Sequence, residues 1–354
     1  MKGLKIVGVS LVVLIVLVFL VIFPVAVVKV YNSIFGVRIQ TEAQNQFTVE
    51  HYPGLQVENV SFKTKQGHNL AGYCYEKDNQ QQAKGVVVIS HGFGGGGHCG
   101  YMALIDFFAS NGYFVFAYDA TGNDNSEGEA VGGFPQGVAD LDYALRYVKS
   151  KEAYAELPIF LVGHSWGAYS VGNVLNFHTD VAGAVLFAGF NTSENLIRQE
   201  GEQYAGRLKE LMTSYAKIYE RLKYGSYAKY SVNEGIDKAK NAQILIVHSS
   251  DDRTVLAENG YDLFLQEHKD NPRVSFVLYD DRGHSDLFYD RETVFYRGIL
   301  KERYIRYLLE HKVPDSDEAR VAFRDDPNYV DFEWCFQLDE ELIGNILDMF
   351  KKGE

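Results

Sequence analysis

The chain has 354 residues, of which 46% are hydrophobic and 14% aromatic, and its formal net charge is −13 with a pI near 5.3. This length can bury one large core with an inserted subdomain. The acidic balance leaves no basic face for phosphates, so we expect no nucleic-acid partner. Cys74, Cys99 and Cys335 lack paired zinc spacing, and structural disulfides are not expected.

The N-terminal segment Ile6–Val28 is an almost unbroken apolar run without a charged residue, long enough to span a bilayer. It is too long for the core of a cleavable signal peptide, and no small-residue cleavage site follows it. We therefore expect an uncleaved, single-pass membrane anchor. Lys2 and Lys5 precede the run while Lys29 and Arg38 follow it, so the positive-inside rule hardly separates the two orientations. The short two-lysine N-terminus favours an extracytoplasmic domain.

The next residues predict a tether and then an ordered α/β domain. Residues 30–54 are polar and loosely patterned, and order is expected from Leu55. Strands at Val57–Phe62 and Leu70–Tyr75 should form an antiparallel hairpin. Later apolar runs, each followed by a helical pattern, indicate a mostly parallel sheet that is buried on both faces. These runs are Gly85–Ser90, Tyr113–Asp119, Pro158–Gly163, Ala182–Phe187, Gln243–His248 and Val274–Tyr279.

Helical periodicity supports the α/β alternation. It is found at Val138, Leu141, Leu145 and Val148, and at Leu342, Ile346 and Phe350 behind the candidate N-cap Asp339. Residues 191–241 show no strand but contain an apolar stripe at helical spacing. Its members are Tyr204, Leu208, Leu211, Tyr215, Ile218 and Leu222. This stripe predicts a helical insertion with one buried face.

A nucleophile elbow is predicted at Gly163-His164-Ser165-Trp166-Gly167. The G-x-S-x-G pattern is weak alone, but here it lies between the apolar run Ile159–Val162 and a helical pattern from Ala168. The turn is so tight that both glycines are needed, and a strained serine presents its hydroxyl. Ser165 is therefore the candidate nucleophile.

The glycine-rich loop His91–Gly97 follows the strand that ends at Ser90. Its backbone can turn toward the elbow, so we assign the N–H groups of Phe93 and Trp166 to an oxyanion hole. A flexible turn or a phosphate cradle is the alternative, although no G-K-[ST] sequence follows.

A serine hydroxyl is a poor nucleophile and needs a base that a carboxylate orients. His284 follows the last predicted strand, behind a glycine that lets its ring reach back, and is the candidate base. The alternative is a solvated surface histidine. The acid should follow the strand after the insertion, where Asp251 and Asp252 are both present.

Together these motifs resemble the α/β-hydrolase superfamily, in particular its serine aminopeptidase and monoacylglycerol-lipase-like branch, over about residues 57–350. The resemblance implies an α/β-hydrolase fold. The acid motif of this family, H-G-x-x-D-x-x-V, matches His248–Val255 with serine for glycine and selects Asp252. The segment Asp119–Gly128 looks like the D-x-x-G-x-G-x-S-x-G loop of the family, in which Asp119 and Ser126 are structural. Two residues, Asn123 and Asp124, interrupt the glycine pattern of that loop.

Together with the anchor expected from the apolar N-terminal run, the resemblance implies a membrane-anchored serine hydrolase. It should act on carboxylic esters of a small or medium acyl group through Ser165, His284 and Asp252, and its expected partner is a small-molecule acyl ester or amide. Peptidase, amidase or acyltransferase activity would use the same triad, and a non-catalytic binding protein is a further alternative. No cofactor is expected. The residues His91, His98 and Cys99 lack a regularly spaced fourth ligand, so no metal is expected either.

The expected organisation is an anchor over residues 1–29, a tether over 30–54 and an α/β-hydrolase domain over 55–354. Within this domain, residues 191–241 should form a helical cap over Ser165, and the apolar stripe should line an acyl pocket. Packing on the sheet edge or in a dimer is the alternative for this helix. The segment 289–337 is longer than the family needs, and a second cap element is one interpretation of it.

Overall fold

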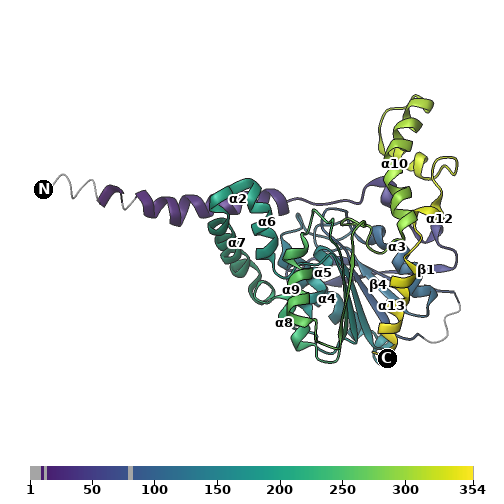
Figure 1. The fold of residues 1–354 in the computed structure, drawn as a ribbon, viewed down its shortest axis with the longest axis horizontal. Helices are drawn as coiled ribbons and strands as arrows, with labels where there is room; N and C mark the ends of the chain where they lie inside the picture. The colour runs from purple at the N-terminus through teal and green to yellow at the C-terminus, as the bar shows by residue number, and fades with distance from the viewer. Residues whose placement is uncertain (1–8, 12–13, 79–82, 354) are drawn as a thin grey trace.

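The computed structural model of the chain describes residues 9–11, 14–78 and 83–353 (Figure 1). Lys2, Lys5 and the start of the predicted apolar run lie outside this part. Each predicted strand is present, and its ends lie within two residues of the prediction, because short apolar runs between turns mark buried strands clearly. The strands are β1 (Leu55–Lys63), β2 (Asn69–Lys77), β3 (Val86–Ser90), β4 (Phe114–Tyr118), β5 (Ile159–His164), β6 (Gly183–Phe187), β7 (Gln243–Ser249) and β8 (Val274–Tyr279).

These strands form one sheet in the order β1-β2-β4-β3-β5-β6-β7-β8. β2 pairs antiparallel with β1 and β4, and all other neighbours are parallel. The predicted mostly parallel sheet with an opening hairpin is therefore confirmed. Ser90 pairs with Gly163, and His248 pairs with Leu278, so the loops after β3, β5, β7 and β8 leave from the same edge of the sheet.

Helices cover both faces of the sheet, as Figure 1 shows. One face carries α4 (Phe134–Ser150), α5 (Trp166–Val174), α8 (Val232–Lys238) and α9 (Tyr261–His268). The other face carries α3 (Met102–Ser110) and α13 (Glu340–Lys351). The predicted apolar positions of α4 and α13 are buried, and Asp339 caps α13 by accepting a hydrogen bond from the N–H of Leu342. The two cores are therefore separated by the sheet.

A helix over Val9–Phe35 is long and apolar enough to cross a membrane, a property that it shares with signal sequences. Its stretch Val18–Ile22 is π-helical, and α2 (Phe23–Phe35) follows without interruption. Leu20 is 68% exposed, whereas Val27, Tyr31 and Phe35 are buried in the core of the domain. The helix thus continues beyond residue 29, because its last turns have their own packing partners.

Phe35 packs against Phe93 and Phe134 of the main domain, at 5.3 and 4.8 Å between ring centroids. The other partners belong to the insertion between β6 and β7, in which α6 (Ser193–Ala205) and α7 (Lys209–Tyr224) precede α8. Tyr215 of the predicted stripe contacts the ring of Phe23, and Tyr219 contacts Tyr31 at 5.2 Å between ring centroids. Other stripe residues, Leu208, Ile218 and Leu222, are exposed, and the side chain of Tyr204 lies outside the described residues. The stripe therefore packs in part against α2, an arrangement that we did not predict.

Residues 36–47, which we call the strap, follow α2 and lie fixed on the domain. Arg38 donates hydrogen bonds to the carbonyl oxygens of Asp124 and Ser126 at 2.8 and 3.0 Å. The N–H and hydroxyl of Thr41 both donate to the carboxylate of Asp124 at 2.6 Å. Order therefore begins well before Leu55, because polar side chains fix a segment that has little apolar periodicity.

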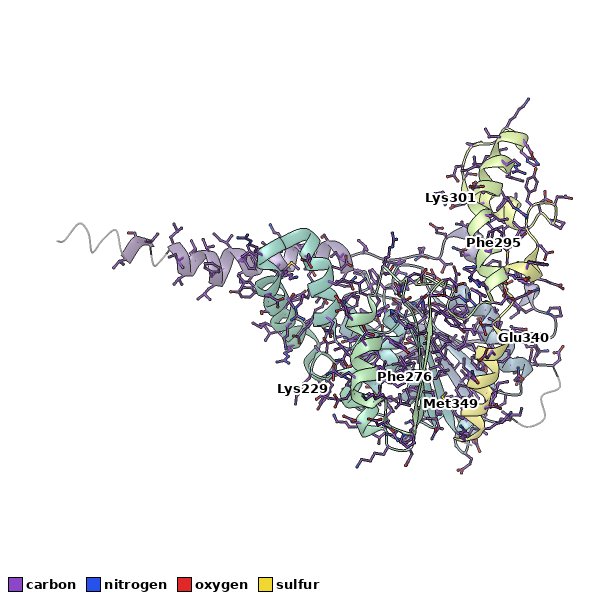
Figure 2. The ribbon with its side chains drawn as sticks, in the orientation of Figure 1. Lys229, Phe276, Phe295, Lys301, Glu340 and Met349 are labelled. Carbon is purple, nitrogen blue, oxygen red and sulfur yellow. The ribbon has the colours of Figure 1, made fainter. Side chains whose placement is uncertain are left out.

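Residues 291–335, which we call the arm, project from the domain between β8 and α13 (Figure 1). The arm contains α10 (Arg291–His311), α11 (Asp317–Arg324) and α12 (Phe332–Cys335). Figure 2 shows Phe295 and Lys301 on α10, and Phe295 is 74% exposed. The arm has a small core of its own, formed by Tyr296, Tyr307, Phe323, Val330 and Cys335. The apolar cluster of the arm is thus separate from the two cores that lie on the faces of the sheet.

A buried carboxyl group joins α2 to α7. Glu220 is 1% exposed, and it accepts hydrogen bonds from the hydroxyls of Tyr31 and Ser193. Burial raises the pKa of Glu220 to about 7, and the charge of Glu194 acts in the same direction. The two hydrogen bonds and the charge of Lys223 oppose this rise. The carboxyl therefore holds its proton more tightly in the folded chain than in the unfolded chain.

We predict that Glu220→Gln reduces the pH dependence of stability. The pKa of Glu220 is raised from the ordinary value of about 4.3 to about 7 in the folded chain. The stability that this shift contributes, at most about 4 kcal/mol, is fully present below about pH 4.3 and is lost as pH rises through about 7. The denaturation midpoint of the full chain in detergent, measured from pH 4.5 to 8, should fall less in this variant. Glu210→Gln, an exposed change on the same helix, is the control. An unchanged slope in Glu220→Gln would contradict the prediction.

Candidate active site

The predicted elbow forms where β5 ends and α5 begins. Ser165 has φ 55° and ψ −115°, a left-handed conformation that is strained for a residue with a side chain. A Cβ atom on Gly163 would lie 2.4 Å from the carbonyl oxygen of Gly167, and one on Gly167 would lie 1.9 Å from that of Ser90. Both glycines of the pattern are therefore required by close backbone contacts.

The structure brings the three predicted catalytic residues together. Ser165 Oγ lies 2.9 Å from His284 Nε2, and His284 Nδ1 lies 2.8 Å from Asp252 Oδ2. Because the carboxylate accepts the Nδ1 proton, Nε2 is left to accept the serine proton. The Asp252 side chain is fully buried and that of His284 is 16% exposed. The arrangement can therefore activate a serine hydroxyl beside a partly open surface.

The two candidate acids have different partners. Asp252 Oδ1 also accepts the N–H groups of Thr254 and Val255 at 2.8 and 3.0 Å. Burial opposes ionisation, but the hydrogen bond and charge of His284 and these N–H groups outweigh it, so the pKa of Asp252 is lowered. Asp251 instead accepts the N–H of Gly283 at 2.9 Å. Of these two carboxylates, only that of Asp252 contacts the imidazole of His284.

The predicted oxyanion donors lie on two fixed segments. His91 Nε2 accepts the N–H of Ala120 at 2.9 Å, which leaves Nδ1 to donate to the carbonyl of Gly92 at 2.8 Å. Burial lowers the pKa of His91, so the ring is neutral and holds this loop. Within the described part of the chain, the N–H groups of Phe93 and Trp166 have no hydrogen-bond partner. Both donors are therefore available to an oxyanion.

A second hydrogen-bond chain connects the oxyanion loop to the base, and we did not predict it. The N–H of Gly92 donates to Tyr101 Oη, which donates to His164 Nδ1, and both distances are 2.9 Å. His164 Nε2 donates to the carbonyl oxygen of His284 at 2.8 Å. Burial, with the charge of His284, lowers the pKa of His164 to about 3, so the ring stays neutral. His164 was visible as the variable residue of the elbow, but nothing in the sequence indicated Tyr101.

The loop at Asp119–Gly128 has structural roles. Asp119 accepts hydrogen bonds from the ring and the N–H of His98, and Ser126 Oγ donates to the carbonyl of Asp119. Asp124, which interrupts the family pattern, also accepts the N–H of Gly97 at 2.9 Å in addition to its bonds from the strap. Among the described residues, no group of three or more His, Cys, Asp or Glu side chains is arranged to hold a metal ion.

Sequence similarity to known proteins is found in the central part of the chain. The family described as serine aminopeptidase, S33, matches residues 81–239, which include Ser165 but neither Asp252 nor His284. Rat monoglyceride lipase is 36% identical over 110 residues, which is 30% of this chain and 35% of that protein. Caffeoylshikimate esterase from Arabidopsis thaliana is 32% identical over 122 residues, which is 33% of this chain and 36% of that protein. The chain thus spans about a third of the length of the curated relatives that it matches.

Solved structures resemble a larger part of the chain. An esterase from Pyrococcus furiosus has a TM-score of 0.53 at 18% identity, with 75% of this chain and 94% of that chain covered. An α/β hydrolase from Penicillium has a TM-score of 0.50 at 18% identity, with 72% and 99% covered. These likenesses confirm the α/β-hydrolase fold, and the sequence matches confirm the resemblance to the serine aminopeptidase and monoacylglycerol-lipase-like branch.

Proposed function

We propose that this α/β-hydrolase-fold chain is a membrane-anchored serine hydrolase that cleaves carboxylic esters through an acyl-enzyme. The observation that carries the proposal is the continuous contact from Ser165 Oγ through the His284 ring to Asp252, at 2.9 and 2.8 Å. The curated relatives with sequence similarity are named as a monoglyceride lipase and an esterase, which supports an ester as the substrate.

In the acylation step, Ser165 Oγ attacks the ester carbonyl carbon while His284 Nε2 takes the hydroxyl proton. The carbonyl oxygen becomes an anion, to which the N–H groups of Phe93 and Trp166 donate. His284 then gives its proton to the leaving alkoxide, and the alcohol departs as the acyl-enzyme forms. The buried carboxylate of Asp252 stabilises the imidazolium that forms in between.

Deacylation repeats these steps with water. His284 takes a proton from water, the hydroxide attacks the acyl carbon, and the proton returns to Ser165 Oγ as the acid is released. A peptide or an amide would follow the same route, and the description of the matched family as a serine aminopeptidase makes peptide hydrolysis the second candidate. Acyl transfer to an alcohol would differ only in the acceptor.

The proposed anchor is the helix Val9–Phe35, in which most apolar side chains of the described residues 9–11 and 14–22 are exposed. We propose that the domain lies outside the cytoplasm behind this anchor, with Lys2 and Lys5 on the cytoplasmic side of the apolar run. Protease protection in intact, sealed cells tests this orientation. Externally added protease should digest the domain, and a protected domain would reverse the orientation.

Ser165→Ala should abolish turnover of esters and covalent labelling by a fluorophosphonate probe, because it deletes only the attacking oxygen. The expected loss of kcat is on the order of 10⁴-fold to 10⁶-fold with an unchanged denaturation midpoint. Ser214→Ala, on the exposed side of α7, should keep both activities. Labelling that persists in Ser165→Ala would refute the assignment of the nucleophile.

Asp252→Asn should cost far more activity than Asp251→Asn. An amide at Asp252 no longer fixes the imidazole tautomer, and a loss of roughly 10⁴-fold in kcat is expected. Asp251 supports the N–H of Gly283, so its exchange should cost about tenfold, consistent with the loss of one loop hydrogen bond. Steady-state kinetics on one ester compares the two variants, and equal losses would leave the acid unassigned.

A further inference from the structure

A cavity of about 890 Å³ lies between the strap and the arm and reaches the site at Gly92, Phe93 and His284. Its volume is near the upper end of the range of about 300–1,000 Å³ that is typical of small-molecule sites. The His284 ring that lines it also contacts Ser165 Oγ, so a bound group would lie beside the nucleophile. Among the described residues that line the cavity, none belongs to α6 or α7.

The two walls of the cavity are tied to each other. Arg324 of α11 donates to the carbonyl oxygens of Ala43 and Gln46 in the strap, at 3.3 and 3.2 Å. The strap is fixed in turn to the domain through Thr41 and Asp124, and the arm is held by its own small core. Both walls lie outside residues 81–239, where the family match is found. The cavity is therefore pre-formed, and these two walls come from segments beyond that match, whereas its end at Gly92, Phe93 and His164 lies within it.

The surface of the cavity is largely apolar. Side chains from the strap, the loop after β8, the arm and the residue that follows the arm all contribute to it: Phe47, Phe288, Leu300, Phe323, Phe332 and Phe336. Leu300 lies on α10 and is only partly buried. When an apolar ligand covers partly buried apolar groups of this kind, the buried surface stabilises the complex by about 25 cal/mol per Å².

The basic side chains of the cavity are mostly neutralised by acidic neighbours. Arg297 pairs with Asp286 at 3.0 Å and stacks on the ring of Tyr289, and Arg320 pairs with Asp315 at 2.9 Å. The remaining charged lining residues carry both signs: Glu42, Lys301 and Arg324, of which Arg324 pairs with Asp325. The cavity therefore has no concentrated charge that would call for an ionic ligand.

We propose that this cavity binds the apolar chain of an ester substrate and that Leu300 of the arm contributes to the limit on the length of that chain. The proposal rests on the proposed ester hydrolysis and names the class of ester, one with an extended apolar chain. It also moves the expected acyl pocket from the α6–α7 insertion to the space between strap and arm.

Labelling of the full chain in lipid nanodiscs by alkyl fluorophosphonates tests this proposal. One probe series carries a short or a dodecyl chain on phosphorus, as in the acyl part, and a second series carries it on the alkoxy oxygen, as in the alcohol part. Leu300→Trp takes up part of the cavity beside α10 and should lower the long-to-short ratio of labelling rates by about tenfold in one series. That series then identifies which part of the ester the cavity holds.

Leu309→Trp is the matched control, because Leu309 lies on the same helix, is 73% exposed and does not line the cavity. Leu300→Phe is a milder substitution that keeps the test valid if Leu300→Trp fails to fold, and it should act in the same direction. An unchanged ratio in both series, or an equal fall in Leu309→Trp, overturns the inference and leaves the proposed function standing. Failure of every probe to label wild-type Ser165 overturns the proposed function and this inference with it.

Discussion

The hydrogen bonds that the carboxylate of Asp124 accepts hold the segments around the active site in place. Its oxygens accept the N–H and the hydroxyl of Thr41 and the N–H of Gly97, so that one charged group joins the strap, its own loop and the glycine loop beside Phe93. Hydrogen bonds to an ionised acceptor are about twice as strong as neutral ones. The strap, the glycine loop and one wall of the cavity therefore share this attachment, which the hydrogen bonds of Arg38 and Arg324 supplement.

The active site combines one buried charged group with two buried neutral histidines. Asp252 is ionised and buried beside His284, whereas His91 and His164 are kept uncharged by burial and act through hydrogen bonds. Tyr101 and His164 connect the oxyanion loop to the backbone of His284, so the donor and the base are held in one network. In the proposed reaction, His284 would become charged when it takes a proton and the substrate carbonyl oxygen when it becomes an oxyanion, while His91 and His164 would stay neutral.

Features that depend on local pattern could be predicted from the sequence. The strands follow from short apolar runs, the elbow from two glycines around Ser165, and the position of His284 from chain order. Contacts between distant segments could not be predicted, because neither Tyr101 nor Thr41 belongs to a sequence pattern that indicates which residue it contacts. Asp124 was visible only as a departure from the family loop, and the strap that explains it has too little apolar periodicity to be recognised. The apolar stripe predicted a buried face, but none of its described residues is buried, and α7 instead buries Thr213, Ala216, Glu220 and Tyr224. The contact of Tyr215 with α2 was not foreseen.

The continuity of the N-terminal helix with the core has a geometric consequence. Tyr31 and Phe35 belong to the core of the domain, while Leu20, on the same helix, is exposed. Each residue of an α-helix adds about 100° of rotation and 1.5 Å of rise. One residue inserted between these two parts would therefore turn the whole domain by more than a quarter of a circle about the helix axis. The angular phase of the helix thus sets the direction in which the domain faces.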